Sequence, residues 1–306
     1  MSVSFFDYYS IKFLKFTRHK KLLLLMNFLL RITSFIKITR PINVLITFCV
    51  IVVAAIICIR GEYLISNILF AAIAGALTAG AGNIINDIFD LEIDKINKPD
   101  RPLAAGKLKL NEALGLYLAL VIFSIVLTIF INWPAFVIEV FTSIALFLYS
   151  FILKKVVLIG NLLISFLAGL AFIFGGVTVG HFQYAVIPAI FAFLINLLRE
   201  LVKDMEDLKG DSQKGVLTFP YKYGPLLTKR LIFIFTFILI LATFYPFLFN
   251  IYGIKYFIVV MVIVNPLLIY FIKKLFENDS LKNLNKLSFL LKLNMMFGLI
   301  AIYLGN

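Results

Sequence analysis

Nine apolar stretches, most of them long enough to cross a bilayer, recur along this chain of 306 residues. A transmembrane helix needs about 20 predominantly apolar residues. These runs are too long for the strands of a membrane barrel, and backbone groups that face lipid must bond within their own segment, so we expect helices. The sixth stretch is short unless it continues past Arg199, and Lys292 interrupts the ninth. The stretches are Ile42–Ile59, Tyr63–Ile85, Ala113–Ile131, Pro134–Leu153, Val156–Val179, Tyr184–Leu198, Leu231–Phe249, Tyr256–Ile272 and Leu287–Leu304.

The composition agrees with a bilayer as solvent. Apolar residues make up 62% of the chain and charged residues 15%, whereas soluble domains carry roughly a quarter charged residues. An ordinary cytosolic domain cannot hide so much apolar surface from water. The predicted fold class is therefore all-α, a polytopic membrane protein with about nine transmembrane helices.

The basic residues predict the orientation of these helices. Of 29 Lys and Arg residues, 27 lie in the N-terminal segment or in every second connection, and only Arg60 and Lys255 lie in the others. By the positive-inside rule the basic side is cytoplasmic. We expect a multi-pass cell-membrane protein with its N-terminus inside and its C-terminus outside. The net charge of +13 then faces anionic membrane lipid, so we do not expect nucleic acid as a partner.

The chain divides into two regions. Residues 1–38 mix basic residues with Phe and Leu, a pattern typical of an amphipathic helix on a membrane surface. We predict that this arm lies on the cytoplasmic membrane surface. Residues 39–306 are predicted to form the transmembrane domain.

Acidic residues gather in two similar segments. Both segments read D-x-x-D-L-x-x-D, and they lie 117 residues apart. Spacings of three, four and seven place the three carboxylates of each segment on one helical face. Both segments also fall on the side that the basic residues mark as cytoplasmic. The aspartates are Asp87, Asp90 and Asp94 in the first segment, and Asp204, Asp207 and Asp211 in the second.

Such carboxylate stripes favour a metal ion. Like charges at these spacings repel, and a stripe of this kind persists when a cation lies between the carboxylates. Asn86, four residues before Asp90, adds an oxygen ligand. Oxygen ligands without His or Cys point to Mg²⁺, which usually takes one or two carboxylates plus substrate phosphate oxygens. We therefore predict Asn86 and the six aspartates as ligands of Mg²⁺ ions bridged by a diphosphate; the alternative is ordinary surface charge at solvated helix ends.

The chain resembles the UbiA superfamily of intramembrane prenyltransferases. Asn86-Asp87-x-x-Asp90-x-x-x-Asp94 is similar to the first motif of that superfamily, and Asp204-x-x-Asp207-x-x-x-Asp211 to its second. Arg40-Pro41-x-Asn43 resembles its entry motif. Tyr149 with Lys154 resembles its Tyr-x-x-x-Lys element, but the spacing is one residue longer, so either Lys154 or Lys155 matches. The resemblance covers roughly residues 36–304.

This resemblance implies a fold and a reaction. A central cavity would open to the cytoplasm and hold a Mg²⁺-bound prenyl diphosphate between the two aspartate helices. The catalytic residues would be Asp90, Asp94, Asp207, Asp211, Tyr149 and Lys154. Tyr149 would face the allylic cation, and cations would stabilise the leaving diphosphate. The substrate-binding residues would be Arg40, Asn43, Arg101, Lys203 and Lys214.

The resemblance also bears on the acceptor. The segments Arg199–Asp211 and Gly160-Asn161 look most like the archaeal members that transfer a geranylgeranyl group, from geranylgeranyl diphosphate, to the hydroxyl of geranylgeranylglyceryl phosphate. That reaction forms the second ether bond of archaeal lipids. The alternative reaction is C-prenylation of an aromatic acid such as 4-hydroxybenzoate. A membrane transporter is the non-enzyme alternative, although transporters place their charges near the midplane.

Overall fold

The structure, a computed structural model, describes residues 29–212 and 218–306. Within these ranges the secondary structure is helical, without strands, and nine helices are long and apolar enough to cross a membrane. The predicted all-α fold class is confirmed. The spans are α2 (Pro41–Cys58), α3 (Ile65–Phe89), α5 (Leu110–Ile129), α6 (Trp133–Phe151), α7 (Ile159–Thr178), α8 (Val186–Ser212), α9 (Phe219–Leu248), α10 (Ile254–Val259) continued by a π-helical turn into α11 (Asn265–Glu277), and α12 (Leu281–Gly305).

Three short elements lie outside the long helices. The helix α4 (Leu91–Asn97) follows α3, and two 3₁₀ turns, η1 (Leu153–Lys155) and η2 (Phe182–Ala185), precede α7 and α8. Residues 29–38 are helical. The rest of the predicted amphipathic arm lies outside the described residues.

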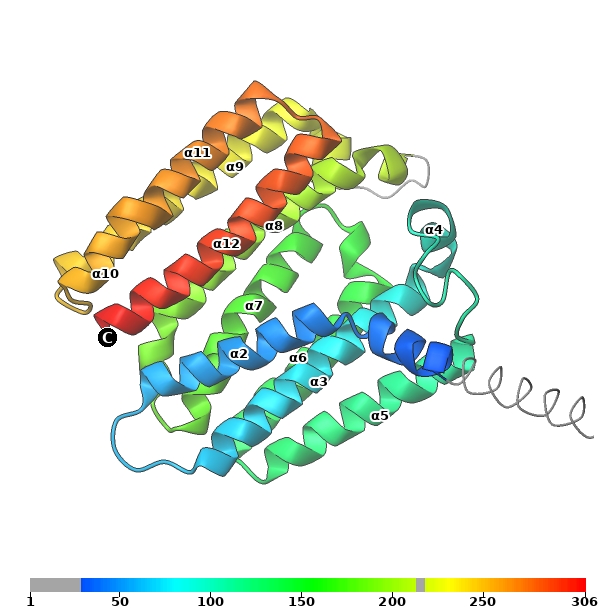
Figure 1. Cartoon of the computed structure of the whole chain (residues 1–306), viewed down its shortest axis with the longest axis horizontal. Coiled ribbons are helices and arrows are strands. Elements are labelled where there is room, and N and C mark those ends of the chain that lie inside the picture. The colour runs from blue at the N-terminus through cyan, green and yellow to red at the C-terminus, as the bar shows by residue number, and fades with distance from the viewer. Residues whose placement is uncertain (1–28, 213–217) are drawn as a thin grey trace, which may run out of the picture.

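The helices pack as two groups (Figure 1). The largest core cluster joins α8 to α9, α10, α11 and α12, through residues such as Leu198, Phe271 and Leu291. Smaller clusters join α2, α3, α5, α6 and α7. Contacts between α7 and α8 connect the two groups. The backbones of α7 and α8 lie close together, since a Cβ atom at Gly169 on α7 would lie 2.7 Å from the carbonyl oxygen of Ala189 on α8.

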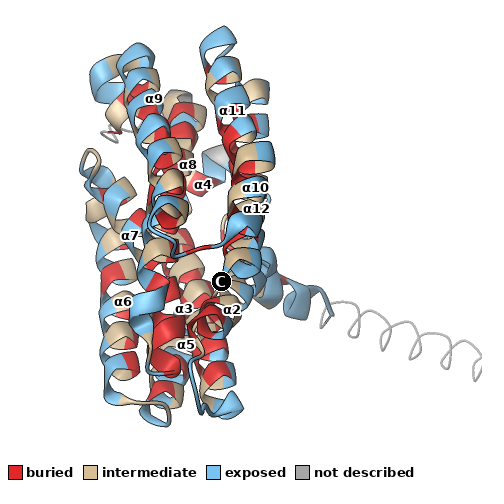
Figure 2. Ribbon diagram, turned by 90° about the vertical axis from the view of Figure 1, so that its left-hand side faces the viewer, coloured by how far each residue is buried: buried red, intermediate tan, exposed pale blue. Residues whose placement is uncertain are grey.

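Two helices occupy the interior of the bundle. In α3 and in the span that includes α8, 61% of the residues of the membrane-crossing window are buried, against 44% or less in the other seven spans of the described chain. Figure 2 shows the buried residues along the inward faces, with exposed residues toward the surrounding lipid. The two aspartate segments therefore lie at the ends of the two most buried helices.

Two predicted spans were too short. The sixth, expected to end near Leu198, continues as α8 to Ser212, and the seventh, expected from Leu231, begins at Phe219. The added turns are rich in charged and polar residues, so hydropathy ends the span although the backbone remains helical. Within α9, Gly224 adopts φ 83° and ψ 160°, and the helix kinks there.

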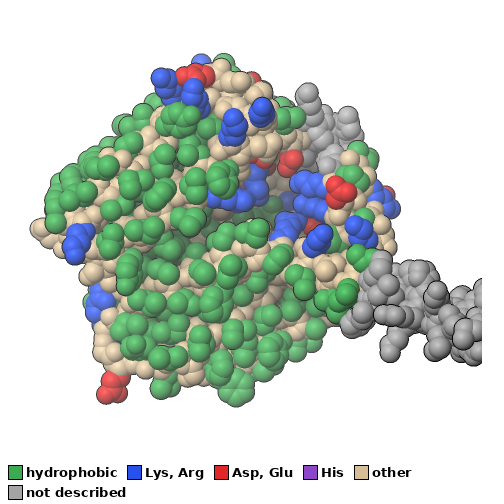
Figure 3. Space-filling view, in the orientation of Figure 1, with side chains coloured by type: hydrophobic (Ala, Val, Ile, Leu, Met, Phe, Trp, Pro, Cys, Tyr) green, Lys and Arg blue, Asp and Glu red, His purple; other side chains and the backbone are tan. Residues whose placement is uncertain are grey.

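An opening separates α2 from α12 on one side of the bundle. At the end remote from α4 the two helices are joined, because Asn306 Nδ2 donates to the carbonyl oxygen of Ile57 at 3.0 Å and Arg60 Nη2 donates to Asn306 Oδ1 at 2.9 Å. From this joined end the helices diverge toward the end where α4 lies (Figure 1). The hollow visible in Figure 3 lies between them.

Candidate active site

The first aspartate segment lies where α3 ends and α4 begins. Asp87 is in the last turn of α3, Asp90 is the junction, and Asp94 is in α4. The three aspartates come from two consecutive helices, because Asp90, with φ −93° and ψ 5°, ends α3. Asp87 and Asp94 nevertheless share one partner, Arg101, from the loop after α4.

Two arginines bind the buried carboxylates of this segment. Asp87 and Asp94 are 2% and 4% exposed. Arg40 Nη2 lies 2.5 Å from Asp87 Oδ1, and Arg101 Nη1 lies 3.0 Å from the same oxygen and 2.5 Å from Asp94 Oδ2. Burial raises the pKa of Asp94, and the charge of Arg101 opposes that effect. A buried carboxylate without such a partner would be strongly destabilising.

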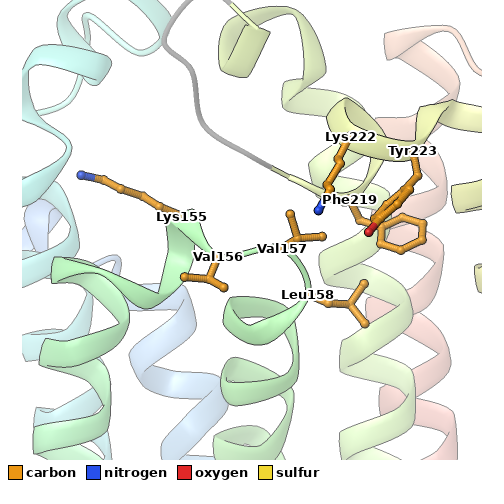
Figure 4. Close-up of a pocket in the computed structure, with 7 residues that line it drawn as sticks. All are labelled: Lys155, Val156, Val157, Leu158, Phe219, Lys222 and Tyr223. Atoms are coloured by element: carbon orange, nitrogen blue, oxygen red, sulfur yellow. The ribbon is translucent and has the colours of Figure 1, made fainter.

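Asp90 is held by an amide and an ammonium group. Asn86 Nδ2 donates to Asp90 Oδ2 at 2.9 Å, and Lys154 Nζ, from η1, donates to Asp90 Oδ1 at 2.6 Å. A close approach of α7 positions η1, since a Cβ atom at Gly160 would lie 2.9 Å from Lys154 Cα. Lys155 instead is exposed and borders a surface pocket of about 530 Å³, and its side chain points away from Lys222 on the other side of that pocket (Figure 4).

The second aspartate segment lies in the last turns of α8. Asp204 Oδ2 accepts a hydrogen bond from Asn161 Nδ2, in the first turn of α7, at 2.8 Å. Asp207 is exposed. Asp211 belongs to the same helix, but its side chain is outside the described part of the structure. Lys214 also lies outside the described residues.

Tyr149, near the end of α6, lies against the first turn of α7, since a Cβ atom at Gly160 would lie 3.3 Å from its ring. The charges that act on its hydroxyl are those of Glu200 and Asp204 on α8, Asp90 at the end of α3, and Arg40. Both aspartate segments are thus within electrostatic range of one side chain near the end of α6. Figure 3 shows acidic and basic side chains together around the hollow between the two helix groups.

Two further predicted residues have partners of their own. Asn43 is half-buried in the first turn of α2, where its backbone N–H donates to the carbonyl oxygen of Arg40 at 2.8 Å. Lys203 Nζ lies 2.8 Å from Glu200 Oε1. Lys203 therefore belongs to a second cationic group on α8 and does not bind the first aspartate segment.

The donor set fits a hard cation shared with a ligand. The side chains of the two segments offer carboxylate and amide oxygens, which suit Mg²⁺. Among the described residues, no group of three or more His, Cys, Asp or Glu side chains is arranged to hold a metal ion. Since Mg²⁺ usually takes only one or two carboxylates and completes its shell with water and phosphate oxygens, the arrangement fits ions that are bound together with a phosphorylated substrate.

One buried acid, Glu139, lies outside both aspartate motifs and was not among the residues predicted from the sequence. Glu139, on α6, is 2% exposed and accepts a hydrogen bond from Thr78 Oγ1 on α3. It lines a cavity of about 230 Å³ together with Asn196 and Phe174. The sequence does mark this residue, because Glu139 is a lone carboxyl within an apolar span, and ionisable residues inside membrane spans are rare.

Comparison with known proteins places the chain in a family. Residues 44–296 match the UbiA prenyltransferase family. A digeranylgeranylglyceryl phosphate synthase from Methanosphaera stadtmanae is 32% identical over 271 residues, which cover 89% of this chain and 98% of that protein. A solved digeranylgeranylglyceryl phosphate synthase structure aligns with TM-score 0.75 and 34% identity over 90% of this chain and 98% of that one.

A more distant structure shares the fold. A UbiA homologue from Archaeoglobus fulgidus, bound to GPP and Mg²⁺, aligns with TM-score 0.61 and 17% identity over 88% of this chain and 99% of that one. The similarity extends over nearly the whole length of each of these proteins. The chain is a multi-pass membrane enzyme, and it belongs to the UbiA prenyltransferase family.

Proposed function

We propose that this prenyltransferase transfers a geranylgeranyl group from geranylgeranyl diphosphate to the hydroxyl of geranylgeranylglyceryl phosphate, and so forms the second ether bond of an archaeal lipid. The observation that carries the reaction type is that the corner between α6 and α7 contacts both aspartate segments, Lys154 at Asp90 and Asn161 at Asp204. The near full-length similarity to digeranylgeranylglyceryl phosphate synthases supports the acceptor. The transporter hypothesis has no support from these relatives.

The diphosphate end of the donor would be bound by the charged residues around Tyr149. Arg40, Arg101 and Lys154 now bind carboxylates, and they would turn to the diphosphate oxygens when the substrate arrives. Asn43 follows Arg40 in α2 and would contact the same end of the donor. The Mg²⁺ ligands would come from Asn86, Asp87, Asp90, Asp94, Asp204, Asp207 and Asp211, and the bound cation would supply charge stabilisation for the leaving diphosphate. Lys214 remains a proposed ligand of the donor.

The transfer itself breaks one bond and forms another. The allylic C–O bond to the diphosphate breaks, and the acceptor hydroxyl oxygen bonds to the same carbon while its proton passes to a carboxylate or to the released diphosphate. The ring of Tyr149 would face the positive carbon, which is stabilised by the electron-rich face of an aromatic side chain. The surrounding apolar helices would exclude water, which would otherwise capture that carbon.

An acceptor comparison tests this function. The purified chain, with Mg²⁺ and radiolabelled geranylgeranyl diphosphate, should label geranylgeranylglyceryl phosphate and leave 4-hydroxybenzoate unlabelled. Labelled 4-hydroxybenzoate would instead establish C-prenylation of an aromatic acid. Release of diphosphate without any acceptor would show that the enzyme does not protect the reactive carbon from water.

Removal of the metal or of one carboxylate tests the donor site. EDTA should abolish the transfer and added Mg²⁺ should restore it, because the diphosphate leaves poorly without charge stabilisation. Asp90→Ala or Asp207→Ala should lower the rate by a factor on the order of 10² or more, while the protein still elutes as a folded species in gel filtration. Near-normal rates in either variant would show that the metal assignment is wrong.

A further inference from the structure

A second group of cations begins on α8, just before the second aspartate segment. Arg199 Nη1 and Lys203 Nζ lie 3.1 Å and 2.8 Å from Glu200 Oε1, on the same helix. Glu200 is 8% exposed, so the shared carboxylate holds both cations in place from within the bundle. The Nε atom of Arg199 is buried and has no hydrogen-bond partner among the described residues. One donor of this guanidinium is therefore available to another ligand.

Lys292 on α12 completes this group. The charges that act on its ammonium are those of Arg199, Lys203, Glu206 and Glu200. Packing of α12 against α8 positions it, since the neighbouring Leu291 is fully buried in the core that both helices share. Within the described part of the chain, Lys292 forms no salt bridge. A charged side chain inside a membrane span is costly and usually marks a functional site.

The charge of this group differs from that of the first aspartate segment. There, Arg40, Arg101 and Lys154 all have ion-pair partners among the three aspartates. Here, Arg199 and Lys203 share the single carboxylate of Glu200, and Lys292 forms no ion pair with any described residue. Lys292 and the Nε atom of Arg199 are therefore the groups that an anionic ligand would bind.

The two groups border the same space. Arg40, which binds Asp87 in the first segment, also acts on the carboxylate of Glu200. In Figure 3, basic side chains gather on both sides of the hollow between α12 and α2. Two phosphorylated substrates that react with each other need two separate anion sites, because their phosphates repel. The hollow offers one anion site at the aspartates, which would hold a metal-bound diphosphate. It offers a second at the cations Arg199, Lys203 and Lys292.

We infer that Arg199, Lys203 and Lys292 form the binding site for the phosphate of the acceptor lipid. The inference rests on the proposed function and assigns to it a phosphomonoester lipid, held by its headgroup while its chains extend toward α2 and α12. It also changes the role expected for Lys203, which the sequence motif had associated with the donor diphosphate. A phosphomonoester offers more charge and more acceptor oxygens to these donors than the carboxylate of an aromatic acid.

The test compares Lys292→Gln with Lys286→Gln. Lys286 is exposed on the same helix, six residues earlier, so its removal changes the net charge equally without touching the site. With geranylgeranylglyceryl phosphate, Lys292→Gln should raise the acceptor KM by about tenfold or more and leave the donor KM within about twofold. Lys286→Gln should change neither, and Lys292→Arg should restore most of the acceptor KM.

Two outcomes would overturn the inference. An unchanged acceptor KM in Lys292→Gln would show that the cations do not hold the acceptor, and an equal rise in the donor KM would assign them to the donor. Failure of the proposed function is separate, because it appears as a wild-type chain that does not use this acceptor. In that case the equilibrium binding of geranylgeranylglyceryl phosphate is compared with that of geranylgeranylglycerol. Tighter binding of the phosphorylated lipid that Lys292→Gln abolishes supports the site. Equal binding of the two lipids overturns it.

Discussion

Lys154 and Lys155 occupy adjacent positions and have different surroundings. Lys154 Nζ lies 2.6 Å from Asp90 Oδ1 and is 13% exposed, whereas Lys155 is exposed and borders the surface pocket of Figure 4. We predict that Lys154→Gln lowers kcat about 100-fold, since it removes a charge from the leaving diphosphate, and that Lys155→Gln changes it less than about twofold. Steady-state kinetics with the labelled donor measures both, and equal losses would contradict the assignment.

The sequence predicted individual residues of the site better than their partners. The aspartate motifs and their neighbouring cations stand out because spacing and charge are visible in a sequence. The pairing of Lys154 with Asp90 depends on how η1 is placed against α7, and Gly160 permits their close approach. Glu139 went unnoticed, since one acid in a span forms no pattern. Motif and spacing arguments detect repeated chemistry, but they do not detect a single buried carboxyl.

Close packing between α2 and α7 depends on a glycine. A Cβ atom at Gly175 would lie 2.6 Å from the carbonyl oxygen of Ile51 and 2.7 Å from Ala54 Cβ. Small residues at such interfaces allow the backbones of membrane helices to approach. We predict that Gly175→Val destabilises the protein by about 1–3 kcal/mol through overpacking, seen as a lower Tm in detergent.

Gly298 provides the matched control for that substitution. It lies inside α12, and a Cβ atom there would meet nothing within 4 Å. Gly298→Ala should therefore leave Tm unchanged or raise it slightly, because Ala is preferred over Gly in helices by about 0.5–1 kcal/mol. If both variants lowered Tm equally, the replacement of a helical glycine in general, and not the contact between α2 and α7, would explain the effect.

At the scale of elements, hydropathy located the helices and misplaced some of their ends. Most spans, including α2, α3 and α6 of the site, were predicted within a few residues. The sixth was not, because α8 continues for 14 residues beyond Leu198 through its charged turns. Charged residues end an apolar window, but Arg, Lys and Glu are good helix formers. The charged turns of α8 hold Arg199, Lys203 and Asp204 at fixed spacing, which an irregular loop would not do.

In the whole molecule, the site lies near one end of the bundle. The alternation of the spans places α4, η1 and the turn between α11 and α12 at that end, and Figure 1 shows α4 and this turn there together. At the other end, Asn306 and Arg60 join α12 to α2. The hollow is thus closed at one end and widens toward the end that carries the aspartates, so substrates with long apolar chains could enter from the side between α2 and α12.

The orientation of this end is a proposal that labelling can test. We propose that it faces the cytoplasm, because nearly all basic residues lie on its side of the membrane. The two cysteines, Cys49 and Cys58, are first replaced by Ala, and a single cysteine is introduced at Glu62 or at Lys282, which are exposed at opposite ends of the bundle. A membrane-impermeant maleimide applied to intact cells should label Glu62→Cys directly and Lys282→Cys only after the cells are permeabilised. The reverse pattern would place the aspartates outside the cell, where the positive-inside rule would have failed for this chain. Retained prenyl transfer in both variants would show that the labelled proteins are folded.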